Sequence, residues 1–324
     1  MPTSHDWRAL YPFESHEMRI DEVRYHYLDE GQGEPLLLVH GNPTWSFYWR
    51  ELISKLRGDF RLIAPDHVGC GLSDKPADYD YRLERHVANL VALVEHLDLR
   101  DVTLVGHDWG GAIGLGAALR LSDRFSRFVL LNTAAWVPES IPLRIRICRT
   151  PLLGRLAVQG LNLFARAAMW MAVENRGCLS PAAKAGLLAP YGNWSDRTAI
   201  YNFVKDIPAA EQRPTQGATA GLSSSADEPA EGTAGQASSG TRALLRHIEQ
   251  QLPTLADRPI QFIWGMQDWC FTPACLERFL ETLPNADVRR LDDVGHWVME
   301  EAADEVVTTV RQFLSRHPLP LGSR

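Results

Sequence analysis

The chain lacks the features that mark several large functional classes. Its 324 residues carry a formal net charge of −7, which leaves no global positive field for phosphates, so we expect no nucleic-acid partner. The longest apolar region, 152–173, is interrupted by charged side chains such as Arg155 and Arg166, which argues against a transmembrane segment. Neither a phosphate-binding loop nor a cluster of metal ligands is present, so we expect no metal and no cofactor.

Cysteine is scarce as well. The 5 cysteines are odd in number and scattered, without the paired spacing of a zinc site. Residues 1–18 contain no apolar stretch that could serve as a secretion signal. These features together favour a reduced, cytoplasmic setting, and they leave the oligomeric state open.

What is present is a chain that can bury a large core, since 45% of its residues are hydrophobic. Short apolar runs alternate with longer helical patterns, which is typical of an α/β protein. Several of the runs are continuously apolar, as strands covered by helices on both faces would be. The expected strands are residues 24–28, 35–39, 61–65, 102–106, 128–132, 260–264 and 286–291. The expected helices are residues 83–97, 110–121, 273–283 and 303–314.

The alternation stops after Asn132 and resumes only at Ile260. From about 139 to 208 the sequence predicts helices and turns, rich in Arg, Leu and Ala. Such an excursion from a sheet is typical of a lid or cap, whose apolar side chains either line a pocket or pack the cap onto itself. The three arginines of 144–149 lie among apolar residues, which favours a solvated charged face over weak binding to a membrane surface.

The stretch 209–240 has a different composition. It is dominated by Ala, Gly, Ser, Thr, Pro and Glu, and such a segment cannot bury enough surface to offset the entropy of ordering. We therefore predict a disordered insertion at the end of the cap. The expected division is a core formed by 1–137 and 241–324, a helical cap at 138–208 and this insertion at 209–240.

The pentapeptide Gly106-His107-Asp108-Trp109-Gly110 lies between an expected strand and an expected helix. It has the G-x-nucleophile-x-G form of a sharp strand-to-helix elbow, but with aspartate where serine is usual. A serine hydroxyl must lose its proton as it attacks, whereas a carboxylate is already an anion at neutral pH. A carboxylate attacks amides poorly, but it can displace a leaving group from an alkyl carbon. The elbow therefore favours substitution at carbon over ordinary ester hydrolysis.

A nucleophile in such an elbow needs an acid and then a histidine, in that order along the chain. Asp268 directly follows the sixth expected strand and His296 follows the last one, so both lie where open α/β sheets place their sites. An acid could instead follow the strand that ends at Asn132, but an amide occupies that place, and Glu139 lies in the cap. We predict Asp108 as the nucleophile, His296 as the general base and Asp268 as the acid that orients it.

The loop 40–45 follows the second expected strand. Loops of this type aim a backbone N–H at a developing oxyanion, together with the N–H of the residue after the nucleophile. Here these donors belong to Asn42 and Trp109, whose side chains also offer neutral N–H groups to a departing anion. The alternatives are a turn residue before Pro43 for the first and plain packing for the second. We expect structural roles for His40, His107 and Cys270.

These segments together resemble the haloalkane dehalogenase family of α/β-hydrolases. The matching stretches are HGNPTWSFYWR at 40–50, DHVGCGLSDKP at 66–76, GHDWGG at 106–111 and DVGHWVMEE at 293–301. The resemblance covers almost the whole chain outside 209–240. It implies an α/β-hydrolase fold with a mostly parallel eight-stranded sheet and a helical cap. It also implies that Asp108 displaces halide, that His296 activates water, and that Asn42 and Trp109 hold the halide.

The acid after the later strand, with Asn42 as donor, is similar to the third subfamily of these enzymes. That group resembles the β-lactone decarboxylases of bacterial long-chain olefin biosynthesis, as do the stretches 148–154 and 160–166. In those enzymes the aspartate opens a cis-3-alkyl-4-alkyloxetan-2-one, and carbon dioxide and an alkene are released. Both reactions need an anionic attack on carbon, and they differ in whether water must complete the turnover.

The sequence thus predicts an enzyme for a small apolar substrate, with carbon–halogen hydrolysis first and β-lactone decarboxylation second. An epoxide hydrolase would share the three central residues but would need cap tyrosines as proton donors, for which Tyr191 and Tyr201 are available. A fourth hypothesis is a non-catalytic scaffold, which would not need to retain all three of Asp108, Asp268 and His296.

Overall fold

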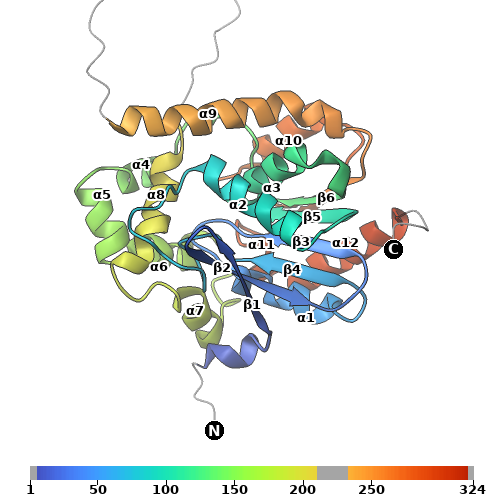
Figure 1. Ribbon diagram of the computed structural model, residues 1–324, viewed down its shortest axis with the longest axis horizontal. Coiled ribbons are helices and arrows are strands. Elements are labelled where there is room, and N and C mark those ends of the chain that lie inside the picture. Colours follow the sequence, from blue (N-terminus) through green and yellow to red (C-terminus); the bar gives the residue numbers. More distant parts are fainter. Residues whose placement is uncertain (1–5, 210–232, 320–324) are drawn as a thin grey trace, which may run out of the picture.

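The computed structural model describes residues 6–209 and 233–319. Its centre is an eight-stranded sheet in the order β1-β2-β4-β3-β5-β6-β7-β8 (Figure 1). β1 pairs with β2 and β2 with β4 in antiparallel fashion, and all the remaining pairs are parallel. The strands are β1 (Ser15–Ile20), β2 (Val23–Glu30), β3 (Pro35–Val39), β4 (Arg61–Pro65), β5 (Val102–His107), β6 (Phe125–Leu131), β7 (Ile260–Gly265) and β8 (Asp287–Leu291).

Helices cover both faces of this sheet, so its inner strands are buried on two sides. One face is packed by α2 (Leu83–His96), α3 (Trp109–Arg120), α9 (Thr233–Gln251) and α10 (Pro273–Thr282), in the upper part of Figure 1. The other is packed by α1 (Arg50–Leu56), α11 (Val298–Glu301) and α12 (Ala303–Arg316). Each layer has its own hydrophobic core, and together they make the three-layered α/β architecture that the sequence predicted.

All seven expected strands are present, as β2 to β8, but β1 was not expected. In β1 exposed and half-buried residues alternate and none is fully buried, because it is an edge strand that pairs only with β2. Its sequence, SHEMRI, contains no apolar run, so the pattern that identified the inner strands is absent there.

A helical segment between β6 and β7 gathers at one end of the sheet (Figure 1). We call residues 138–208 the cap segment. Its α-helices are α4 (Leu143–Cys148), α5 (Leu153–Arg155), α6 (Leu163–Met171), α7 (Pro181–Leu188) and α8 (Thr198–Asp206), and a π-helical turn at Leu156–Gly160 joins α5 to the loop before α6. Short 3-10 turns complete the chain at Trp7–Leu10, Ser46–Trp49, Ser122–Arg124, Ser195–Arg197 and Leu252–Leu255.

The predicted disorder of 209–240 is wrong for residues 233–240, which form the first part of α9; residues 210–232 lie outside the described residues. The physical reason is tertiary packing, because α9 docks on α2 and α3 and buries Leu245 and Ile248 in their core. The Thr241 hydroxyl also donates a hydrogen bond of 2.7 Å to Asp206. Packing of this kind overrides the weak helix preference of the composition.

Within the described residues, no helix is both long and apolar enough to cross a membrane.

Candidate active site

Asp108 occupies the turn between β5 and α3. It has φ +55° and ψ −130°, a conformation that costs energy for any residue with a Cβ and that the surrounding structure must impose. The turn is compact because a Cβ on Gly110 would lie 2.0 Å from the Val39 carbonyl oxygen. The Thr133 hydroxyl donates to the Asp108 carbonyl at 2.6 Å and so fixes the turn against the end of β6. The sequence-predicted elbow is therefore present, and Asp108 borders a cavity.

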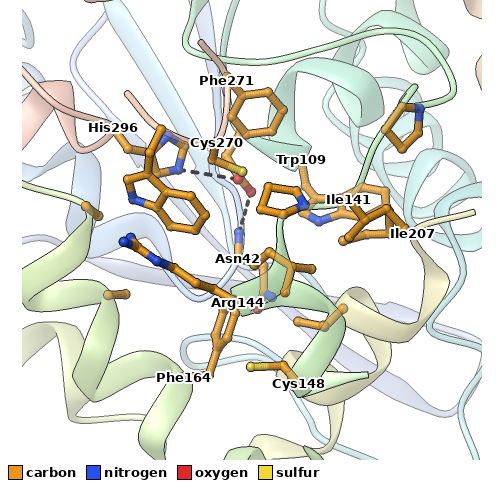
Figure 2. Close-up of a pocket in the computed structure, with 18 of the residues that line it drawn as sticks. Asn42, Trp109, Ile141, Arg144, Cys148, Phe164, Ile207, Cys270, Phe271 and His296 are labelled. Carbon is orange, nitrogen blue, oxygen red and sulfur yellow. Dashed lines mark hydrogen bonds and ion pairs between the residues drawn. The ribbon is translucent and has the colours of Figure 1, made fainter. Parts of the chain in front are cut away.

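Both oxygens of the Asp108 carboxylate have a partner. Oδ1 accepts a hydrogen bond from the backbone N–H of Asn42 at 2.8 Å, and Oδ2 lies 3.4 Å from Nε2 of His296 (Figure 2). Gly41 makes this approach possible, since a Cβ there would lie 2.1 Å from Oδ1. The carboxylate is 8% exposed, so it is held in a fixed orientation and largely out of water. Such a group is ready to attack an apolar ligand that binds next to it.

Asp268 holds the other side of the His296 ring. Its Oδ2 lies 2.7 Å from Nδ1 of His296, and its Oδ1 accepts the backbone N–H of Cys270 at 2.7 Å. Burial disfavours the charged form of Asp268, but the His296 ring and the backbone donors outweigh it and hold the pKa of this carboxyl below its ordinary value. Asp268 is therefore an anion that orients the ring, so that Nε2 faces Asp108.

The charge state of His296 follows from its two neighbours. Burial lowers the pKa of His296, but the carboxylates of Asp268 and Asp108 together reverse this effect and raise the pKa from the ordinary 6.5 to about 10. The ring is therefore protonated at neutral pH in the free protein. Neutralising Asp108, as a covalent ester would, removes one of the two stabilising charges and lowers the pKa of His296 again.

Asn132 is a residue of the site whose role the sequence reasoning did not identify. Its side-chain amide donates to Oδ2 of Asp268 at 3.0 Å and to the Gly265 carbonyl at 3.0 Å, while its Oδ1 accepts the Gly265 N–H at 2.8 Å. It thus ties the end of β6 to the end of β7 and fixes the acid. In the sequence, Asn132 is a polar residue at the end of an otherwise apolar strand. It was considered there only as the position that an alternative acid would have occupied.

The two expected anion donors border the same cavity as Asp108. The side chain of Asn42 makes a long 3.4 Å hydrogen bond from Nδ2 to the Ile200 carbonyl, and its Oδ1 has no partner in the described part of the chain. The half-buried Trp109 packs against Phe203 with ring centroids 5.6 Å apart. In the described residues its indole N–H makes no hydrogen bond to protein. Both side chains therefore keep hydrogen-bonding capacity for a ligand.

The cavity that Asp108 faces has a volume of about 530 Å³. Asp108, His296, Asn42 and Trp109 form its polar end (Figure 2). Most of the remaining wall is apolar and comes from both the core and the cap segment, for example Ala112, Trp136, Ile145, Phe164, Ile207 and Phe271. This volume suits a ligand of ten or more heavy atoms, and the wall offers it mainly carbon contacts.

The residues that we expected to be structural have local partners. His40 bonds the Gly41 carbonyl at 2.7 Å, and the His107 ring bonds the His296 carbonyl at 2.9 Å. Burial and the nearby carboxylates raise the pKa of the Cys270 thiol, which makes it a weak nucleophile. Tyr191 and Tyr201 donate to backbone carbonyls of Thr44 and of Thr150 and Pro151, and neither borders the cavity.

The fold and the elbow define an α/β hydrolase. The family model for the alpha/beta hydrolase fold matches residues 34–303, and the chain belongs to this family. Within it, the chain is related to two kinds of enzyme.

The first kind of relative acts on β-lactones by name. The chain is 38% identical to the cis-3-alkyl-4-alkyloxetan-2-one decarboxylase of Shewanella oneidensis, over 95% of this chain and 90% of that protein. It is 39% identical to the enzyme of the same name from Xanthomonas campestris, over 90% and 93%.

The second kind is haloalkane dehalogenases. The chain is 32% identical to haloalkane dehalogenase 2 of Mycobacterium tuberculosis, over 93% of this chain and 95% of that protein. The crystal structure of the haloalkane dehalogenase DatA from Agrobacterium tumefaciens C58 superimposes with a TM-score of 0.78 at 26% identity, over 94% of this chain and 96% of that one. The resemblance seen in the sequence motifs and the α/β-hydrolase fold are thereby confirmed.

Proposed function

We propose that the chain decarboxylates β-lactones that carry two alkyl chains, through a covalent bond to Asp108. The observation that carries the proposal is an aspartate, in place of serine, held in the elbow at the polar end of a largely apolar 530 Å³ cavity. The sequence motifs alone placed carbon–halogen hydrolysis first. We reverse that order because the decarboxylases are 38% and 39% identical to the chain and the dehalogenase of Mycobacterium tuberculosis 32%.

The proposed reaction needs two bond exchanges and no water. An oxygen of Asp108 attacks C4 of the lactone, and the C4–O bond breaks, so that the ring oxygen becomes part of a free carboxylate on C3. The bond between C3 and that carboxylate then breaks and carbon dioxide leaves. Its electron pair forms the C3=C4 double bond and expels Asp108 from C4, which regenerates the enzyme. No proton is gained or lost in the cycle.

Asn42, Trp109 and His296 stabilise the anions of this sequence. We expect the side-chain donors of Asn42 and Trp109 to hold the carboxylate that appears on C3, because both border the cavity beside Asp108. The protonated His296 ring, 3.4 Å from Asp108, favours the return of that residue to its anionic form when the alkene departs. Asp268 and Asn132 act through His296 and are positioning residues.

The second candidate is hydrolysis of a haloalkane, which the complete Asp108–His296–Asp268 arrangement favours. Here Asp108 displaces halide, which Asn42 and Trp109 hold. A water molecule then attacks the ester carbonyl and gives its proton to Nε2 of His296, whose pKa has fallen with the loss of the Asp108 charge. The alcohol leaves with that proton, and the second proton of the water, left on the Asp108 carboxyl, passes to His296 and restores the carboxylate. In this reaction His296 is a general base, which lactone decarboxylation does not need.

The other two hypotheses, an epoxide hydrolase and a non-catalytic scaffold, have less support. An epoxide hydrolase needs proton donors opposite the nucleophile, and the hydroxyls of Tyr191 and Tyr201 are engaged with backbone carbonyls outside the cavity. A non-catalytic scaffold would not explain the strained backbone of Asp108 or the buried ion pairs of His296.

The test is to offer purified protein a synthetic cis-3,4-dialkyl β-lactone and, separately, a bromoalkane of similar length. We expect carbon dioxide and the alkene from the lactone, measured by gas chromatography, at a higher kcat/KM than bromide release. Faster bromide release would make the second candidate the principal activity. If neither substrate reacts and intact-mass spectrometry finds no adduct on Asp108, both candidates are wrong.

A further inference from the structure

Exposed apolar side chains are concentrated in the cap segment. Among the described residues, every large apolar side chain that is strongly exposed lies between 143 and 194. Leu152 is 88% exposed and Trp170 59%. The others are Leu143, Ile147, Leu153, Leu156, Leu161, Leu163 and Trp194. Soluble domains scatter such residues singly, and a concentration of them marks a surface that is covered in use.

These side chains lie on neighbouring elements. α4, α5 and α6, with the π-helical turn that follows α5, are packed together at the left of Figure 1. Ile147 and Leu163 are about half exposed, and both also border the cavity that contains Asp108. We call the exposed surface of residues 143–176 the outer cap face. The outer cap face therefore adjoins the cavity wall, and apolar residues connect the cavity with the solvent.

The outer cap face is also rich in positive charge. Six arginines lie between 144 and 176, with two acidic residues between 139 and 176, although the whole chain has a net charge of −7. Within the described part of the chain, no carboxylate forms an ion pair with any of the six. Three of them instead stack on exposed or partly buried rings, Arg144 on Trp269, Arg155 on Trp194 and Arg176 on Trp170. Most of the arginines in the rest of the described structure have acidic partners. The positive charge of the outer cap face is therefore available to an anionic partner outside the chain.

We propose that the outer cap face binds to an anionic phospholipid bilayer, which reverses the expectation of a solvated charged face, because the arginines lie beside exposed apolar side chains. Apolar side chains would enter the acyl boundary while the arginines contact lipid phosphates, the arrangement of a protein that lies on a membrane without crossing it. Charge complementarity favours this occupant over a second copy of a chain whose net charge is −7, since only the lipid surface is negative throughout. Lipid-dissolved substrates would then enter the cavity beside Ile147 and Leu163. The binding itself does not depend on which reaction the site performs.

The test is co-sedimentation of the full chain with sucrose-loaded vesicles of phosphatidylcholine, with and without 40 mol% phosphatidylglycerol. We expect binding to the anionic vesicles and its loss at high salt. The double variant Arg146→Glu with Arg166→Glu should bind more weakly by roughly 25-fold, at about fivefold for each arginine lost. Neither residue borders the cavity or forms an ion pair in the described structure, so turnover of a soluble short-chain substrate should stay unchanged.

A matched control carries the same charge change elsewhere, at Arg19 in β1 and Arg120 at the end of α3. We expect Arg19→Glu with Arg120→Glu to bind vesicles like the unaltered chain. A second variant, Leu152→Ser with Leu153→Ser, tests the apolar part of the outer cap face and serves if the arginine variant does not fold. It too should bind more weakly.

Three results would overturn the proposal. The first is no binding to anionic vesicles at low salt, and the second is equal binding by the arginine variant and its control. The third is a concentration-dependent dimer, seen by light scattering, that Leu152→Ser with Leu153→Ser abolishes, because the outer cap face would then be covered by a second copy. All three measurements are independent of turnover, so a failure here is distinct from a failure of the proposed reaction.

Discussion

Replacing His296 by glutamine separates the two candidate reactions. The change removes the ring whose Nε2 lies 3.4 Å from Asp108 and leaves the nucleophile, its Asn42 donor and the cavity in place. Attack by Asp108 on a bromoalkane does not need the ring, but hydrolysis of the resulting ester does. We therefore expect His296→Gln to accumulate an alkyl ester on Asp108 with a bromoalkane and to keep turning over a β-lactone.

The magnitude follows from what else could act as a base. General-base catalysis contributes about a hundred- to ten-thousand-fold. The other titratable groups that border the cavity are Arg144 and the thiols of Cys148 and Cys270, whose pKa values are raised by burial. None of them can take over the proton, so the loss in ester hydrolysis should lie near ten-thousand-fold. Lactone turnover loses only the electrostatic help of the ring, which should cost no more than about a hundred- to a thousandfold.

The assay is intact-mass spectrometry of His296→Gln after mixing with a bromoalkane, with peptide mapping to locate the alkyl group, beside alkene release from the lactone. The unaltered protein, run in ¹⁸O-labelled water, is the control. Label should enter the Asp108 carboxylate only when the ester is hydrolysed. The reasoning is refuted if His296→Gln forms no adduct with a bromoalkane that the unaltered protein consumes, or if lactone turnover falls as far as hydrolysis.

Three further predictions test other parts of the site. Asp108→Ala should abolish both reactions, by at least about ten-thousand-fold in single-turnover assays, since the thiols of Cys148 and Cys270, which also border the cavity, have raised pKa values and are weak nucleophiles. Asn132→Ala removes a 3.0 Å hydrogen bond to Asp268 and should lower the kcat of ester hydrolysis about ten- to a hundredfold with KM nearly unchanged. The pKa of His296 is raised from 6.5 to about 10 in the folded protein, so the stabilisation that protonated His296 contributes is complete below pH 6.5 and is lost as the pH rises through 10. The free energies of unfolding of the unaltered chain and of His296→Gln, measured in urea, should therefore converge over that range.

Which residues meet around Asp108 was more predictable from sequence than the edges of the fold. The inner strands β3, β5, β6 and β7 are continuous apolar runs because both of their faces are covered, and such runs are visible without a structure. Asp268 was predicted because it follows the apolar β7 and His296 because it follows β8, in the order that an elbow nucleophile requires, and the structure brings the two side chains into contact. β1 was missed because it is an edge strand with one exposed and one half-buried face, and its sequence contains no continuous apolar run. The start of α9 was missed because its composition does not favour a helix, whereas the second half of α9 is held by the packing of Leu245 and Ile248 against α2 and α3.

Substrate choice could not be predicted in the same way, because it depends on how the cap segment packs over the core. The two proposed reactions use the same attack by Asp108 and diverge at the ester. A short alkyl group leaves much of the 530 Å³ cavity free for water, which His296 can activate. A lactone with two long chains fills that space, and the loss of carbon dioxide needs no second reactant. The number of carbons that the cavity encloses therefore decides whether the ester meets water before it fragments, and shortening the lactone chains should shift the products from alkene toward hydroxy acid.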